Sequence, residues 1–105
     1  MIERFGVYLV PLDPTVGAEM RKTRPCAVIS PEELNDLIRT VIVAPLTGGE
    51  RRVPYRVDSI FAGKRGQIAL DQMRAVDKGR LVKRVGRLDD AAAGRVTRAL
   101  LEMFA

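Results

Sequence analysis

The chain has 105 residues, enough for one domain with a single hydrophobic core. Its 18 basic and 13 acidic residues give a net charge of +5, which favours a polyanionic partner. It has no histidine and one cysteine, which excludes histidine-based catalysis, His-based or multi-thiolate metal sites and an intramolecular disulfide. No apolar stretch approaches the length of a membrane span, and Met1–Arg4 lacks the apolar segment of a signal peptide, so we expect a cytoplasmic protein without membrane contact.

The first two predicted strands flank a long loop. Gly6–Val10 is rich in residues that suit a pleated sheet, and Pro25–Ser30 forms the second strand. Within it, Cys26–Ile29 is apolar at successive positions, which indicates burial on both faces and makes its cysteine an inert core residue. The loop between them is longer than a hairpin requires, and such ordered loops are usually functional. The proline that opens the second strand restricts Arg24 to an extended backbone, so its side chain leaves the loop in a restricted direction.

A short helical turn and a strong strand follow. Ser30 precedes Pro31–Leu37, which begins with proline and two glutamates, a pattern typical of a capped helix start. Thr40–Ala44 is the clearest strand in the chain. Pro45 weakens the ladder after it, and Thr47–Gly49 predicts a turn.

The second half of the chain predicts three further strands and a helix. The strands are Val53–Asp58, placed at a sheet edge by its proline, then Gln67–Asp71 and Leu81–Leu88, with a turn over Ala62–Gly66. An aspartate at position 89 or 90 can cap a helix that runs through Phe104 with one apolar stripe. We therefore predict one domain over residues 1–105, mainly β with α: a small curled antiparallel barrel or sheet packed against a C-terminal helix.

Four segments together are similar to one known family. They are Tyr8–Glu19, Lys22–Ser30, Val43–Thr47 and Leu70–Asp77, and they occur in the family's order and spacing. On these segments the chain resembles the MazF/PemK (Kid) family of toxin endoribonucleases of type II toxin–antitoxin systems, over nearly its whole length. Each segment alone is a weak signal, whereas four in register are specific.

The resemblance implies a fold, an activity and partners. The fold is a curled SH3-like sheet with a C-terminal helix, as in MazF, PemK and CcdB. The activity is sequence-specific, ribosome-independent cleavage of single-stranded RNA (mRNA) without metal or cofactor, which inhibits translation and growth. The implied partners are a second copy of the chain in a homodimer and a cognate MazE-like antitoxin whose acidic C-terminal tail covers the RNA groove. DNA is contacted only through that antitoxin.

The resemblance also implies site residues. The family's catalytic arginine falls on Arg24, within Thr-Arg-Pro, and its catalytic threonine on Thr47, at the end of Ala-Pro-Leu-Thr. Its loop glutamate matches Glu19, and an aspartate with a role in some members matches Asp71, so both are candidates for catalysis or substrate positioning. PemK-type members carry an arginine two residues before that aspartate, where this chain has Ala69. The Arg24–Thr47 pair is therefore the firmer expectation.

The chemistry of the residues agrees with these roles. Cleavage without metal uses the neighbouring 2′-hydroxyl as nucleophile, and negative charge gathers on the phosphorane oxygens. Arg24 offers a permanently charged planar fork that matches phosphate, so electrostatic stabilisation is its natural role. Thr47 can hydrogen-bond a phosphate oxygen or the 2′-hydroxyl. Glu19 or Asp71 can serve as base if burial or a like charge raises its pKa.

Basic residues and a few aromatic residues supply the candidate RNA surface. A cationic groove can follow a phosphate backbone, and exposed aromatic rings can stack on bases. The candidate RNA-binding residues are Lys22, Thr23, Arg51, Arg52, Tyr55, Arg56, Phe61, Lys64, Arg65 and Gln72.

Other interpretations stay open at this point. An arginine before a proline is most often a solvated loop residue, Thr47 suits a turn, and Asp71 can form a surface pair with Arg74. Two other classes of protein also fit. One is a CcdB-like non-enzymatic gyrase poison, although those proteins rely on a tryptophan near the C-terminus and this chain has none. The other is an RNA-binding barrel without catalysis.

Overall fold

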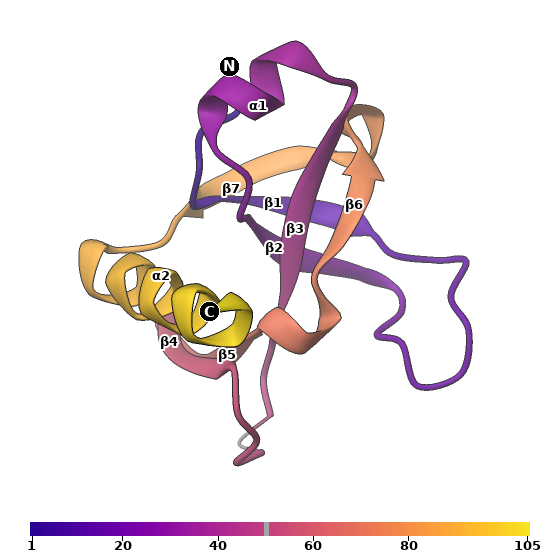
Figure 1. Ribbon diagram of the computed structural model, residues 1–105. Helices are drawn as coiled ribbons and strands as arrows, with labels where there is room; N and C mark the ends of the chain where they lie inside the picture. Colours follow the sequence, from indigo (N-terminus) through magenta and orange to yellow (C-terminus); the bar gives the residue numbers. More distant parts are fainter. Residues whose placement is uncertain (50) are drawn as a thin grey trace.

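The computed structural model describes residues 1–49 and 51–105, and it is a curled antiparallel sheet with one long helix against it (Figure 1). The strands are β1 (Gly6–Pro11), β2 (Thr23–Val28), β3 (Thr40–Thr47), β4 (Arg56–Phe61), β5 (Lys64–Ala69), β6 (Arg74–Asp77) and β7 (Lys83–Arg87). The helices are α1 (Glu32–Leu37) and α2 (Asp90–Phe104), with short 3-10 turns η1 (Leu70–Gln72) and η2 (Lys78–Arg80). The predicted fold class is confirmed.

The sheet has the strand order β4-β5-β3-β2-β1-β7, and β6 also pairs with β3. The first half of β3 pairs with β6 and its last two residues pair with β5. Between these two neighbours, Ala44 and Pro45 have no partner on that side among the paired residues, so the missing N–H of the proline breaks no ladder bond there. The strand therefore continues through Pro45 to Thr47, beyond the predicted end at Ala44.

Both faces of the central strands are buried. In β2, Ala27 packs into one hydrophobic cluster and Cys26 into the other, as alternation along a strand requires. Ala44 and Val43 of β3 divide in the same way. The cysteine is a fully buried core residue, as predicted, and burial raises its pKa to about 12, which keeps the thiol neutral.

Helix α2 packs against the hydrophobic cluster that contains Ala27 and Ala44. Asp89 is the N-cap, and its side chain accepts a hydrogen bond from the Ala92 amide at 2.8 Å. Ala92 and Val96 are buried against the sheet. The other residues of the predicted stripe pack against the same cluster: Ala99, Leu100 and Met103. In the described part of the chain, no helix is long and apolar enough to cross a membrane.

The hairpin of β4 and β5 differs from the prediction in its bounds. β4 starts at Arg56 rather than at Val53, because Tyr55 has a left-handed φ of 66° that interrupts an extended run. The turn consists of Ala62–Gly63 alone, with φ values of 51° and 76°, the type of two-residue turn that matches strand twist. β5 therefore already begins at Lys64. The edge position predicted for β4 is confirmed.

The structure of the chain after β5 also differs from the prediction. β5 ends at Ala69, and Asp71, which the alternating pattern placed in a strand, lies in the 3-10 turn η1. β6 was not predicted, since four residues of mixed polarity carry little periodic signal. The predicted strand Leu81–Leu88 is shorter at both ends as β7.

The start of α1 is held by a different contact than predicted. Pro31 is the N-cap and makes no side-chain capping bond. The Ser30 hydroxyl instead donates to Asn35 Oδ1 at 2.5 Å and accepts from the Ile42 amide of β3 at 3.0 Å. Because Asn35 is buried, this network ties α1 to the sheet rather than capping the helix.

Candidate active site

Arg24 and Thr47 lie at the same end of two neighbouring strands. Cys26 of β2 pairs with Pro45 of β3, and the strands are antiparallel. Arg24 and Thr47 each lie two residues beyond that pair in the same direction, which brings them together at one end of these two strands. Both line a groove of about 550 Å³, which we call the Arg24 groove.

Five residues of the predicted RNA-binding set line the same groove: Lys22, Thr23, Phe61, Lys64 and Arg65. With Arg24, the lining carries four cations, and none of the described residues that line it is acidic. Leu9 and Val85 add apolar surface beside the ring of Phe61. The groove therefore combines positive charge with an apolar wall, a combination that suits a phosphate backbone and unpaired bases.

The Arg24 side chain is half-buried and anchored by one bond. Its Nε donates to the Arg21 carbonyl at 3.0 Å. No other hydrogen bond of its guanidinium is present within residues 1–49 and 51–105, so the terminal nitrogens are available to a ligand. One fixed nitrogen with free terminal donors is an arrangement that can orient an arginine toward phosphate.

The loop before Arg24 is held in a strained conformation. Lys22 has a left-handed φ of 69°. Its amide donates to Asp13 Oδ2 at 3.1 Å, and its carbonyl accepts from the Leu12 amide at 3.1 Å. A non-glycine residue in this region costs about 1–3 kcal/mol and persists where its surroundings fix it, most often at functional sites. The base of the long loop is therefore built to hold Lys22 and Thr23 at the groove.

Gly66 packs tightly against the backbone of Thr47 at the groove. A Cβ at Gly66 would lie 2.4 Å from the Thr47 carbonyl oxygen, closer than any side chain can approach. β5 and the end of β3 therefore meet backbone to backbone at this point. No sequence signal indicated this contact, because Gly66 was predicted to end a turn and instead lies within β5.

We expect Gly66→Ala to destabilise the protein, because the new methyl group collides with backbone that cannot rotate away. Overpacking of this kind typically costs about 1–3 kcal/mol. Urea unfolding should show a lower midpoint. Gly48→Ala is the matched control, since a Cβ at Gly48 meets nothing within 4 Å. Equal midpoints for the two variants would contradict the close contact.

Glu19 and Asp71 lie in a different hollow from Arg24. With Gln72, they line a cavity of about 230 Å³ that we call the Asp71 hollow. Gln72 Oε1 accepts from the Met20 amide at 3.3 Å, and Glu19 accepts from the Val16 amide at 2.6 Å. Gln72 therefore holds the long loop against η1, Glu19 bonds within the loop, and neither these two residues nor Asp71 line the Arg24 groove.

Asp71 pairs with Arg56. Arg56 Nε and Nη2 donate to its two carboxylate oxygens, both at 2.9 Å. This replaces the surface pair with Arg74 considered above; Arg74 donates instead to the Leu12 carbonyl. The bond from Arg56 lowers the pKa of Asp71, which is opposite to the rise that a general base would need.

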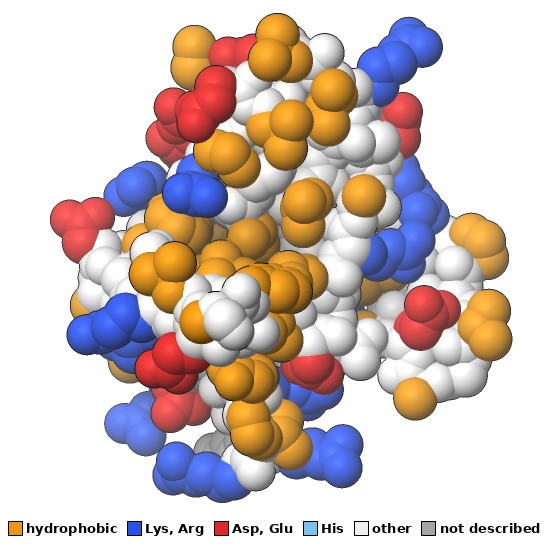
Figure 2. Space-filling view, in the orientation of Figure 1, with side chains coloured by type: hydrophobic (Ala, Val, Ile, Leu, Met, Phe, Trp, Pro, Cys, Tyr) orange, Lys and Arg blue, Asp and Glu red, His pale blue; other side chains and the backbone are white. Residues whose placement is uncertain are grey.

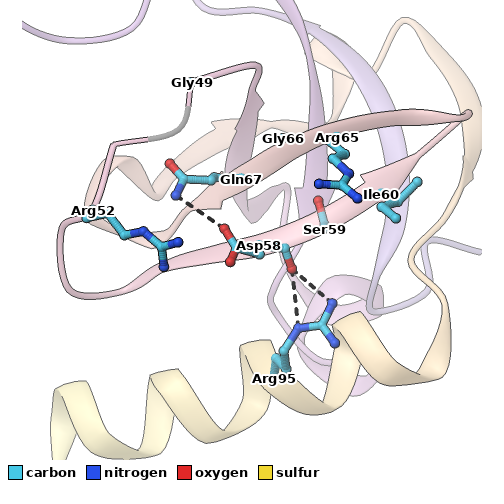
Figure 3. Close-up of a pocket in the computed structure, with 9 residues that line it drawn as sticks. All are labelled: Gly49, Arg52, Asp58, Ser59, Ile60, Arg65, Gly66, Gln67 and Arg95. Atoms are coloured by element: carbon cyan, nitrogen blue, oxygen red, sulfur yellow. Dashed lines mark hydrogen bonds between the residues drawn. The ribbon is translucent and has the colours of Figure 1, made fainter.

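The other expected RNA-binding residues are spread over the edge of the sheet. Tyr55 and Arg56 line a shallow cavity beside α2. Arg52 lines a further hollow on the β4–β5 hairpin, drawn in Figure 3. Arg51 is exposed, and its carbonyl accepts from Gln67 Nε2 at 2.9 Å. The expected set therefore gathers only in part around Arg24.

Two residues that the sequence prediction left out take part in these sites. Gln67 is buried and lines both the Arg24 groove and the hollow of Figure 3, and Arg95 reaches the latter from α2. Neither residue belongs to a recognisable sequence motif, because α2 and β4 come together only in the folded protein. Within the described residues, no group of three or more acidic or thiol side chains is placed to hold a metal ion.

The fold is shared with solved MazF proteins. The crystal structure of MazF (Form-I) from Deinococcus radiodurans matches with a TM-score of 0.84 at 20% identity, covering 98% of this chain and 96% of that one. An endoribonuclease from Mycobacterial species, solved in complex with its cognate antitoxin, matches with a TM-score of 0.83 at 20% identity, covering 99% and 95% of the two chains. The sheet and its C-terminal helix therefore have the fold of MazF proteins.

Sequence comparison identifies the family directly. Residues 3–104 match the family described as PemK-like, MazF-like toxin of type II toxin-antitoxin system, and the chain belongs to it. The chain is also 34% identical over 101 residues to the Endoribonuclease PemK of Escherichia coli, a match that covers 90% of this chain and 76% of that protein.

Proposed function

We propose that the protein is the endoribonuclease toxin of a toxin–antitoxin system and cleaves single-stranded RNA at the Arg24 groove. The observation that carries the proposal is the meeting of Arg24 and Thr47 in one groove with four cations. Family membership supports the toxin class, and the PemK relative supports the activity.

The proposed reaction needs no metal. The 2′-oxygen of the ribose attacks the adjacent phosphorus, its proton passes to a base, and the bond to the 5′-oxygen breaks as that oxygen takes up a proton. The products are a 2′,3′-cyclic phosphate and a 5′-hydroxyl. Arg24 stabilises the charge on the phosphorane oxygens through its free terminal nitrogens, and Thr47 hydrogen-bonds a phosphate oxygen or the 2′-hydroxyl.

We assign Glu19 and Asp71 to support of the site rather than to proton transfer. Glu19 bonds within the long loop, and Asp71 is neutralised by Arg56. Gln72, next to Asp71, holds the same loop through the Met20 amide. The Arg56–Asp71 pair thus fixes η1, and η1 fixes the loop that leads to Arg24.

Substitutions at Asp71 separate these two roles. We expect Asp71→Asn to lose less than about tenfold in cleavage rate, because the amide keeps one acceptor for Arg56, and Asp71→Ala to lose more. If Asp71 were the general base, both variants would lose the rate factor of about 10²–10⁴ that a general base contributes, and they would lose it equally. Arg56→Gln should resemble Asp71→Asn. A loss above a hundredfold in Asp71→Asn would assign proton transfer to Asp71.

The proposed partners follow from charge and from relatives. The mycobacterial endoribonuclease was solved in complex with its cognate antitoxin, and a Deinococcus radiodurans MazF was solved together with MazE. We propose a MazE-like antitoxin whose acidic tail neutralises the cationic Arg24 groove.

We also propose a homodimer, as the family resemblance implies. Figure 2 shows apolar side chains gathered over α1, where Leu34, Leu37 and Ile38 are exposed. An apolar patch of this kind suits a protein partner.

The experiment that tests the activity is to expose a long mixed-sequence RNA to the purified protein and sequence the new 5′-ends. We expect cuts at one short recognition sequence and none with the Arg24→Ala/Thr47→Ala double variant. Binding without new ends would favour the RNA-binding barrel. Inhibition of gyrase without new ends would favour the CcdB-like class, which the absence of tryptophan already disfavours.

A further inference from the structure

A second cationic hollow lies on the outer face of the β4–β5 hairpin (Figure 3). It has a volume of about 500 Å³, and we call it the arginine hollow. Three arginines from three parts of the chain line it: Arg52 from the segment before β4, Arg65 from β5 and Arg95 from α2. Three arginines placed around one hollow by separate elements are not explained by the solvation of one helix or strand face.

Arg95 is fixed in place by the backbone. Its Nη2 and Nε both donate to the Asp58 carbonyl, at 2.9 and 3.3 Å. Figure 3 shows its guanidinium reaching from α2 up to β4. An arginine held by two of its five donors keeps its charge at a defined point, which lowers the entropy lost when a ligand binds.

The positive charge of the hollow is not neutralised by the lining residues that the structure describes. Among them, Asp58 is the one acidic residue, and its carboxylate accepts instead from Gln67 Nε2 at 3.4 Å. No carboxylate of the described residues lies within 4.0 Å of the guanidinium nitrogens of Arg52, Arg65 or Arg95. The described lining residues, three cations and one anion, leave 3 − 1 = +2.

One further polar atom at this wall has no partner. Both neighbours of the Gln67 amide, the Arg51 carbonyl and the Asp58 carboxylate, are acceptors, so Nε2 must face them. This leaves Gln67 Oε1 as the buried side-chain oxygen without a donor in the part of the chain that the structure describes. Unpaired buried acceptors are rare. This oxygen can only accept a hydrogen bond, so it is not a contact for a phosphate.

The arginine hollow adjoins the Arg24 groove. Ser59, Arg65, Gly66 and Gln67 line both. The absence of a side chain at Gly66, where β5 meets Thr47, leaves only backbone between the two cavities at that point. A chain that leaves the groove across β5 therefore enters a second site with excess positive charge.

We propose that the arginine hollow binds a phosphate of the same RNA strand, flanking the cleaved one, with Arg95 as its fixed anchor. This inference rests on the proposed function, because it assumes that the groove holds RNA. It adds a substrate contact from α2 that no sequence motif indicated. It also makes the length of the RNA, beyond the cleaved linkage, a determinant of affinity.

The test measures the affinity for RNA at several salt concentrations. One RNA is long enough to reach both cavities and carries one 2′-deoxynucleotide at the cut site. The other is a short RNA centred on the cut site. For Arg95→Gln we expect about tenfold weaker binding of the long RNA. The slope of log affinity against log salt should fall by about 0.7, the value for one lost phosphate contact in single strands. Binding of the short RNA should change less than twofold.

Arg98→Gln is the matched control: it removes the same charge from the same exposed helix at a residue that does not line the hollow. We expect it to bind both RNAs as the wild type does. The inference is wrong if Arg95→Gln also binds like the wild type, or if both variants weaken the long RNA equally. Cleavage of the all-ribose RNA by the wild-type protein is measured in parallel. If the binding results are as expected but the wild type does not cleave this RNA, the proposed function is wrong and the proposed phosphate site in the arginine hollow still stands.

Discussion

Arg24→Ala should lower the cleavage rate by about a hundredfold to a thousandfold, the usual loss when one preorganised donor to a transition-state charge is removed. The terminal nitrogens of Arg24 have no hydrogen-bond partner among the described residues, and the side chain lines the same groove as Thr47. Arg24→Lys should recover little, since an ammonium group cannot offer two parallel donors to a phosphate. The measurement is single-turnover cleavage of a defined RNA, which reports the chemical step rather than binding.

The control separates chemistry from charge. Arg39→Ala removes an exposed arginine away from the groove and should cut within twofold of the wild type. The thermal midpoint of Arg24→Ala should stay close to that of the wild type, because the side chain makes one hydrogen bond at the surface end of β2. Cleavage by Arg24→Ala at the wild-type rate would remove Arg24 from the active site.

One 2′-deoxynucleotide at the cut site should abolish cleavage there altogether. In the proposed reaction the 2′-oxygen is the nucleophile, so its removal deletes a reactant rather than weakening a contact. Binding should fall by less than about tenfold, since the loss is at most one hydrogen bond among many phosphate contacts. The measurement is gel analysis of a labelled RNA with the single substitution, beside the all-ribose RNA.

A deoxy substitution one nucleotide away from the cut serves as the control and should be cleaved. If the RNA with the substitution at the cut site is cleaved there at a similar rate, water or another group must be the nucleophile. That result would leave the role of Arg24 as phosphate binder intact and would overturn the proposed products.

The sheet could be predicted from the sequence because its signals are local. The apolar run Cys26–Ile29 predicted a strand buried on both faces, and it divides between the two clusters. Asp89 and the apolar stripe predicted α2 with its cap. Arg24 and Thr47 were paired only through the family resemblance, since each is an ordinary loop or turn residue by local criteria.

The site around them could not be predicted, because it depends on contacts between distant segments. The left-handed φ of Tyr55 delays β4, and the two-residue turn at Ala62–Gly63 then sets Arg56 opposite Ala69. That register brings Arg56 to Asp71 and lowers the pKa of the carboxyl group. A one-residue shift would reverse every side chain of the hairpin. No periodicity in the sequence specifies it.

The most direct test of the central claim is cleavage of a defined RNA in excess EDTA, with the ends of both products identified. We expect undiminished cleavage, a 5′-hydroxyl on one product and a 2′,3′-cyclic phosphate, or the 3′-phosphate formed from it, on the other. Loss of cleavage in EDTA that magnesium restores, or a 5′-phosphate on the product, would contradict a metal-independent site built on Arg24 and Thr47.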